Sequence, residues 1–219
     1  MRLIFATQNE HKVEEARGIL GSDIEVVTPA SLGLTEDVEE TGTTFQENSL
    51  LKANFIKERL GGDCFADDSG LEVDILGGAP GIYSARYGGE AHNFEANIRQ
   101  LLTDMSAKLM EAGFARQFGV EKINASFKAR FRTVATLILG GQIKTFEGVL
   151  EGSITFFRAG VGGFGYDPVF VPDEILSPDG SLVPNMEKLT VAELGTEVKN
   201  HISHRSKALR EMADYLKSL

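Results

Sequence analysis

The stretch Cys64-Phe65-Ala66-Asp67-Asp68-Ser69-Gly70 places two adjacent carboxylates at the end of an apolar run. Such a run predicts a buried strand that ends at the acidic pair. Acidic groups gathered where strands end commonly bind a hard cation through oxygen ligands. The alternative is that Asp67 and Asp68 only cap a turn, because Asp-Ser-Gly is ordinary turn sequence. A second acidic pair upstream, Glu39-Glu40, meets another glycine turn and favours the cation site.

Composition limits the classes of protein to which this chain can belong. The 219 residues predict one compact domain, residues 1–219, with enough length for a large core. The single cysteine, Cys64, cannot form an internal disulfide, which favours the cytoplasm. No apolar run is long enough for a membrane span or a signal peptide, so we expect no membrane partner. The net charge of −10 argues against a nucleic-acid partner, and a small anionic ligand would need a local cationic pocket or a bridging metal.

Strand and helix patterns alternate in the first part of the chain. Residues 2–6 predict a strand, residues 7–9 a polar loop, and residues 10–20 an amphipathic helix. Thr44 and Glu47 form a capping box that opens a helix to about residue 60, closed by two glycines. A short strand over residues 24–27 lies between these two helices. The order is typical of βα units.

Longer strands dominate the second part of the chain. Residues 127–139 and 143–150 predict two strands joined by a glycine turn, and residues 153–157 predict more β structure. Helical patterns cover residues 94–109 and 201–219. The expected fold class is therefore α/β (α+β): a mixed, partly antiparallel, elongated β-sheet flanked by helices, with two lobes and a central cleft.

Two segments near the N-terminus carry groups that suit phosphate. Thr7-Gln8-Asn9-Glu10-His11-Lys12 lies at a strand-to-helix junction, where free N–H groups and the helix dipole favour an anion. Lys52 lies on the helix that follows Glu40. The alternatives are a simple helix cap at Thr7 or Asn9 and solvated surface lysines.

Two segments nearer the C-terminus suit a base and its phosphates. Phe164-Gly165-Tyr166-Asp167 presents two rings and a carboxylate that can stack on a base and bond its edge, or else its aromatics pack in the core. Lys199, His204 and Arg205 offer donors for phosphate or carbonyl oxygens, or else form a solvated basic helix start. The sequence contains no P-loop, zinc or nucleophile motif, so covalent catalysis is not expected.

Six motifs are spread, in a fixed order, over most of the length of the chain. They are T-x-N-x-x-K at residues 7–12, E-T-G-x-T-F-x-E-N at 40–48, A-D-D-S-G-L at 66–71, P-G-I-Y-S-A-R-Y-G-G at 80–89, G-F-G-Y-D-P at 163–168 and S-H-R at 203–205. This set resembles the inosine triphosphate pyrophosphatase family, whose members hydrolyse non-standard purine nucleoside triphosphates such as ITP, dITP and XTP. Two departures concern a dimer contact or a lobe edge: residues 101–126 exceed the family length, and Phe127 stands where an arginine is expected.

The resemblance implies a reaction and a set of roles. Water attacks the α-phosphorus and releases nucleoside monophosphate and pyrophosphate, which removes deaminated purines from the nucleotide pool. Mg²⁺ is the implied cofactor, Glu40 and Asp68 are its ligands, Asp68 is also the general base, and Asp67 assists. A homodimer is implied as well. The substrate contacts implied, some through backbone N–H groups, are Thr7, Gln8, Asn9, Glu10, His11, Lys12, Lys52, Ser69, Phe164, Gly165, Tyr166, Asp167, Lys199, His204 and Arg205.

Base choice has a partial chemical basis. The guanidinium of Arg205 only donates hydrogen bonds, so it suits the 6-oxo group of hypoxanthine or xanthine and not the 6-amino group of adenine. Two rival functions stay open. One is a Maf-type enzyme for modified pyrimidine nucleotides, disfavoured by S-H-R and F-G-Y-D, and the other is a nucleotide-binding module without turnover, disfavoured by Glu40 and Asp68.

Overall fold

The computed structural model describes residues 1–36, 38–111 and 127–219. The chain divides into two compact units. Unit 1 comprises residues 1–69, 133–149 and 203–219, and unit 2 comprises residues 70–132 and 150–202. Residues 112–126, within the segment longer than the family norm, lie outside the described residues.

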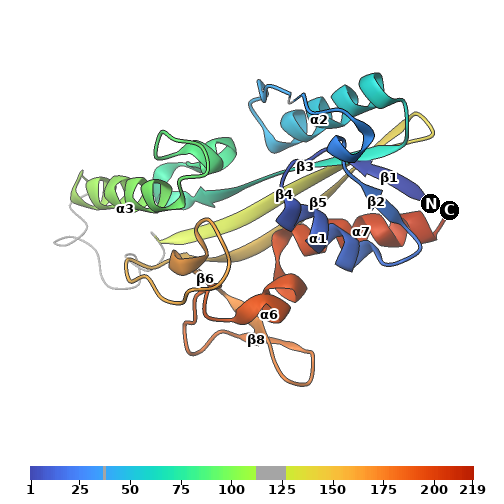
Figure 1. The fold of residues 1–219 in the computed structure, drawn as a ribbon. Coiled ribbons are helices and arrows are strands. Elements are labelled where there is room, and N and C mark those ends of the chain that lie inside the picture. Colours follow the sequence, from blue (N-terminus) through green and yellow to red (C-terminus); the bar gives the residue numbers. More distant parts are fainter. Residues whose placement is uncertain (37, 112–126) are drawn as a thin grey trace. The chain divides into compact units, whose positions relative to one another are not determined.

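A six-stranded sheet has the order β2-β1-β3-β4-β5-β6. Strand β1 lies between β2 and β3 and pairs with both in parallel, whereas β6 pairs with β5 in antiparallel orientation (Figure 1). The predicted mixed α/β sheet flanked by helices is therefore confirmed, while the predicted central cleft stays a prediction. The strands are β1 Arg2–Phe5, β2 Glu25–Val27, β3 Cys64–Val73, β4 Lys128–Leu139, β5 Gln142–Ile154, β6 Phe170–Pro172, β7 Glu174–Leu176 and β8 Leu182–Pro184.

The helices agree with most of the predicted segments. The caps of α2 are the expected ones: the Thr44 side chain accepts a hydrogen bond from the Glu47 N–H, and Gly61 ends the helix in the left-handed conformation. The α-helices are α1 Glu10–Leu20, α2 Phe45–Leu60, α3 Phe94–Glu111, α6 Gly195–Ile202 and α7 His204–Lys217. Short 3₁₀ helices cover Ala30–Leu32, Asp74–Leu76, Gly81–Arg86 and Asp167–Val169.

Unit 1 is held together by apolar side chains from its strands and from the helices α1, α2 and α7. The rings of Phe5 and Phe65 stack with centroids 4.3 Å apart in its core. Helices α1 and α7 pack against each other, and Leu209 and Met212 of α7 are fully buried. The neighbouring strands β1 and β3 thus enter the same core that anchors both helices.

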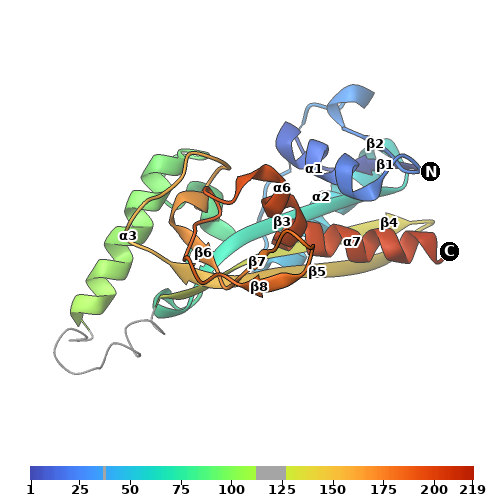
Figure 2. The same ribbon diagram turned by 90° about the horizontal axis from the view of Figure 1, so that it is seen from below.

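Unit 2 has its own core, to which α3, β6 and α6 contribute. Leu101 and Met105 of α3 and Phe170 of β6 are fully buried in it. A separate two-stranded antiparallel sheet, β7-β8, lies in this unit, and α6 packs against β7 (Figure 2).

Three sequence predictions about element boundaries are wrong. Strand β3 does not end at the acidic pair but continues to Val73, so Asp67 and Asp68 lie within a strand and cap no turn. The β structure predicted at residues 153–157 extends only to Ile154, where β5 ends. The helix predicted over residues 201–219 is broken at Ser203, which caps α7, and α7 ends at Lys217.

Candidate active site

Asp68 lies at the centre of a carboxylate and lysine cluster in unit 1. The ammonium of Lys52 donates hydrogen bonds to Asp68 Oδ1 and to Glu40 Oε1, both at 2.9 Å. Asn48 Nδ2 donates to the other oxygen of Asp68 at 3.3 Å. The two carboxylates that the sequence predicts as metal ligands therefore converge on one cation, although Glu40 lies on a loop and Asp68 on β3.

Burial and a like charge shape the ionisation of this cluster. Burial raises the pKa of Asp68, and the nearby Glu40 carboxylate raises it further, while Lys52 offsets part of the shift. Burial alone would lower the pKa of Lys52, but Asp68, Asp67 and Glu40 outweigh it and raise that pKa. Lys52 is thus a firmly held cation beside a carboxylate whose affinity for a proton is increased.

Asp67 has different partners, because neighbouring side chains on a strand point to opposite faces. Lys12 Nζ donates to Asp67 Oδ1 at 2.9 Å, and Arg205 Nε donates to Oδ2 at 3.0 Å. The Ser69 hydroxyl also donates to Oδ2, at 3.1 Å. Burial opposes ionisation of Asp67, but Lys12 and Arg205 outweigh it and hold its pKa well below the usual range. Asp67 is therefore a permanent anion that organises the cations around it.

Arg205 is buried in this same network. Its Nη1 donates to Glu15 on α1, so two carboxylates bind the guanidinium. The backbone just before Arg205 lies so close to β5 that only glycine fits at position 148. A Cβ at Gly148 would lie 1.9 Å from the carbonyl oxygen of His204. The first turn of α7, with His204 half-buried at its start, is thereby held against β5. The role of Arg205 as a reader of the purine 6-oxo group stays a prediction.

The N-terminal loop provides both a helix cap and a charged contact. Asn9 caps α1 and accepts from the N–H groups of His11 at 3.0 Å and Lys12 at 3.4 Å, and Thr7 Oγ1 accepts from the Asn9 N–H at 3.2 Å. Lys12 is not a solvated lysine, because its ammonium is bonded to Asp67. The side chains of Gln8, Glu10 and His11 are exposed.

The aromatic loop of unit 2 forms a second cluster. Asp167 is buried, and its Oδ2 accepts from the Phe164 N–H at 2.8 Å and from Lys199 Nζ at 2.6 Å. The Lys199 ammonium also lies 4.1 Å from the centroid of the half-buried Phe164 ring. A side chain at Gly163, where φ is +72°, would place its Cβ 2.0 Å from Asp167 Oδ2. Asp167 therefore holds the loop that presents Phe164.

Tyr166 belongs to the core of unit 2 and not to an open surface. It is 4% exposed, and its hydroxyl donates to the carbonyl oxygen of Ser84 at 2.9 Å. The Ser84 hydroxyl in turn accepts from the N–H of Leu71 on β3 at 2.8 Å. The side chain of Tyr166 thus supports the loop from the core. Of the two roles open to this aromatic residue, core packing or contact with a base, the structure has core packing.

The predicted site residues fall into two groups, one in each unit. Unit 1 brings together Lys12, Glu40, Lys52, Asp67, Asp68, Ser69 and Arg205, and unit 2 brings together Phe164, Tyr166, Asp167 and Lys199. Sequence reasoning assigned no role to Asn48 or Glu15. Asn48 is the last residue of the motif E-T-G-x-T-F-x-E-N, and a polar residue on the buried face of a helix is a sequence signal for a functional contact. No local signal connects Glu15 with an arginine 190 residues away.

The donor set of unit 1 fits a partial magnesium site. Two carboxylates supply hard oxygen atoms, and Mg²⁺ is usually bound by one or two carboxylates together with substrate phosphates and water. Within the described ranges, no group of three or more His, Cys, Asp or Glu side chains is placed to hold a metal ion.

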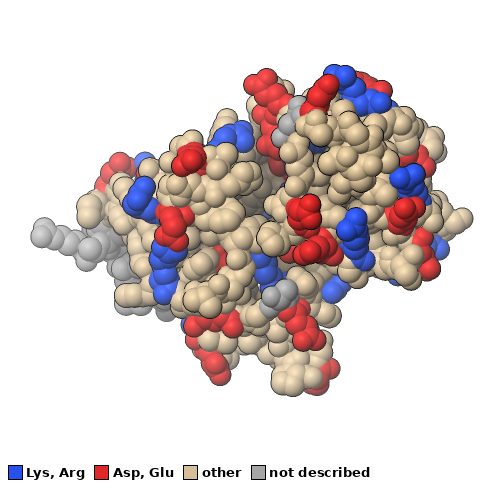
Figure 3. Space-filling view, viewed as in Figure 1, with Lys and Arg blue, Asp and Glu red and all other residues tan. Residues whose placement is uncertain are grey.

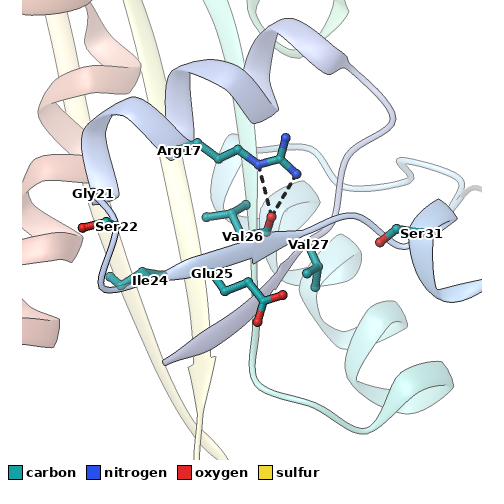
Figure 4. Close-up of a pocket in the computed structure, with 8 residues that line it drawn as sticks. All are labelled: Arg17, Gly21, Ser22, Ile24, Glu25, Val26, Val27 and Ser31. Atoms are coloured by element: carbon teal, nitrogen blue, oxygen red, sulfur yellow. Dashed lines mark hydrogen bonds between the residues drawn. The ribbon is translucent and has the colours of Figure 1, made fainter.

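Pockets and surface charge complete the description. A pocket of about 30 Å³ is lined partly by Thr7, Gln8 and Lys52. A larger open pocket of about 520 Å³ lies beside β2, where Arg17 donates to the Val26 carbonyl, and none of the predicted site residues lines it (Figure 4). On the face drawn in Figure 3, the basic side chains lie scattered among acidic ones. No helix in the described part of the chain is long and apolar enough to cross a bilayer.

The chain belongs to the Ham1 family, whose model matches residues 3–215. It is 44% identical to a dITP/XTP pyrophosphatase of Porphyromonas gingivalis, with 98% of this chain and 97% of the relative covered. A dITP/XTP pyrophosphatase of Christiangramia forsetii is 40% identical, with 99% of both chains covered. The solved Ham1 protein of Coxiella burnetii is 30% identical, with a TM-score of 0.80 and 100% of both chains covered. The solved Ham1 protein of Staphylococcus aureus is 34% identical, with a TM-score of 0.79, and the match covers 100% of this chain and 99% of that protein.

Proposed function

We propose that this protein hydrolyses non-standard purine nucleoside triphosphates, namely ITP, dITP and XTP, to the nucleoside monophosphate and pyrophosphate. Relatives of similar length named dITP/XTP pyrophosphatase support this assignment. The observation that carries it is the convergence of Glu40 and Asp68 on the Lys52 ammonium, 2.9 Å from each. Two carboxylates and a lysine at one point suit a metal-bound triphosphate.

Glu40 and Asp68 are the proposed Mg²⁺ ligands. When bound, the ion supplies neutralisation of phosphate charge and alignment of the phosphates. Asp68 accepts the proton of the attacking water, a role suited to a carboxylate whose pKa is raised by burial. Lys12 and Lys52 stabilise the phosphates and the leaving pyrophosphate, and no covalent intermediate is required.

The aromatic loop of unit 2 is the proposed base subsite. The Phe164 ring stacks on the purine, and Asp167 with Lys199 fixes the position of that ring. His204 and Arg205 remain the proposed donors toward the base. We further propose that the enzyme is a cytoplasmic homodimer, for which the family resemblance and the single buried cysteine are the support.

The direct test is the release of pyrophosphate from ITP, XTP, GTP, ATP and UTP, with and without Mg²⁺. We expect turnover of ITP and XTP to exceed that of the other three, and EDTA to abolish it. Preferential turnover of UTP would instead favour a Maf-type activity. Nucleotide binding without pyrophosphate release would identify a binding module.

A further inference from the structure

Asn48 is a fully buried amide in the first turn of α2 whose two ends are both occupied. Its Oδ1 accepts from the Gly42 N–H at 2.8 Å, and its Nδ2 donates to Asp68 Oδ2 at 3.3 Å. A backbone N–H only donates and an ionised carboxylate only accepts, so the two partners fix which end of the amide is which. Asn48 therefore connects the loop that contains Glu40 with the carboxylate on β3.

The loop itself is held tightly against the start of α2. Glu47 Oε2 accepts from the N–H of Thr43 at 2.6 Å and from its hydroxyl at 2.9 Å. A Cβ at Gly42 would lie 2.6 Å from Asn48 Oδ1 and 2.7 Å from Glu47 Cβ, so glycine is required there for space. The backbone two residues after Glu40 is thus fixed by contact with Asn48.

Asp68 is likewise held at both oxygens. Lys52 binds Oδ1 and Asn48 binds Oδ2, which determines the rotation of the carboxyl group. The amide does this without adding charge beside the ligand. Metal sites need their ligands held within about 0.5 Å of the productive geometry, and the groups that hydrogen-bond the ligands provide this.

We propose that Asn48 is a positioning residue that sets the geometry of Glu40 and Asp68 for the divalent ion. The inference rests on the proposed function, since it assumes that these carboxylates bind Mg²⁺. Asn48 touches neither phosphate nor base in this assignment, and it acts through its contacts with Gly42 and Asp68. A purely structural role would stabilise α2 without affecting the affinity for metal.

The experiment measures Mn²⁺ binding to the full chain without nucleotide, by the electron paramagnetic resonance signal of free Mn²⁺. Asn48→Ala is expected to raise the Mn²⁺ dissociation constant by about 10- to 100-fold. Ser49→Ala is the matched control. It removes a buried hydrogen bond between Ser49 Oγ and Thr136 Oγ1, which lie 2.6 Å apart, on the same helix turn and with neither carboxylate as a partner. The Mn²⁺ affinity of Ser49→Ala should stay within about twofold of that of the wild type. A general destabilisation of α2 would instead weaken Mn²⁺ binding in both Asn48→Ala and Ser49→Ala.

Gly42→Ala disrupts the contact between Asn48 and the loop that contains Glu40, because the added Cβ collides with Asn48 Oδ1. This variant tests the proposal if Asn48→Ala does not fold. Weaker Mn²⁺ binding in that variant is expected as well. Wild-type affinity in a folded Asn48→Ala or Gly42→Ala protein overturns the proposal, as does an equal loss in Ser49→Ala. If the wild-type protein itself binds no Mn²⁺, with or without ITP, then the metal site of the proposed function fails too. That failure is visible in the wild-type titration and is therefore distinct from a failure of Asn48 alone.

Discussion

Asp67 and Asp68 are adjacent and chemically identical, but the strand points their side chains to opposite faces and gives them different partners. Asp67 is bonded to Lys12, Arg205 and Ser69 and remains ionised, whereas Asp68 has a raised pKa beside Glu40 and Lys52. Neighbouring groups whose pKa values are pushed apart are typical of an acid–base site. These environments suit Asp68 to the proposed proton transfer and Asp67 to holding the neighbouring cations in place.

Asp68→Asn should therefore abolish most turnover while leaving nucleotide binding. Loss of a positioned general base costs about 100- to 10,000-fold in rate, and loss of one of the two proposed metal ligands adds to this. The measurement is pyrophosphate release from ITP together with the dissociation constant of ITP. Glu72→Gln is the control, because it neutralises a carboxylate of the same strand that is paired with Arg132 instead. Near-normal turnover in Asp68→Asn would remove this residue from the base role.

Among the elements, helices and their caps follow most directly from local sequence. Asn9, Thr44 and Gly61 stand where capping rules place them, and α1 and α2 have the predicted bounds. The end of β3 does not follow local sequence. Asp-Ser-Gly favours a turn, but the residues around it continue as a strand in the middle of the sheet, so pairing overrides local preference. The hydrogen bonds of Asp67 and Asp68 come from residues far along the chain, which no local pattern reveals.

The break between α6 and α7 offers a test of a cap that sequence periodicity misses. Ser203 has extended backbone angles, and its hydroxyl accepts from the Ser206 N–H at 3.1 Å. Ser203→Ala should reduce the free energy of unfolding by about 1 kcal/mol, measured by urea denaturation. Ser206→Ala is the control. Its buried hydroxyl has no hydrogen-bond partner among the described residues, so its removal should be nearly neutral or stabilising. A larger loss in Ser206→Ala would contradict this account of the cap.

For the whole molecule, connectivity bears on whether residues 1–219 form a single domain. The chain passes between the two units at residues 69–70, 132–133, 149–150 and 202–203. The first three passages lie inside β3, β4 and β5. Each unit is thus assembled from discontinuous segments, and neither consists of a continuous stretch of chain that ends in a linker. Composition predicts one domain but cannot reveal these passages, because they depend on long-range strand pairing.

Unfolding in urea should consequently be one cooperative transition reported equally by a probe in each unit. Cys64, in unit 1, is fully buried, and burial raises its thiol pKa to about 11, so pulsed alkylation labels it only after unfolding. Tyrosine fluorescence reports mainly on unit 2, which contains Tyr83, Tyr87 and Tyr166 of the four tyrosines. We expect the two midpoints to coincide, and protein in high urea gives the fully labelled control. Alkylation and fluorescence midpoints that differ by more than about 0.5 M, well beyond the error of a two-state fit, would show two units that unfold independently.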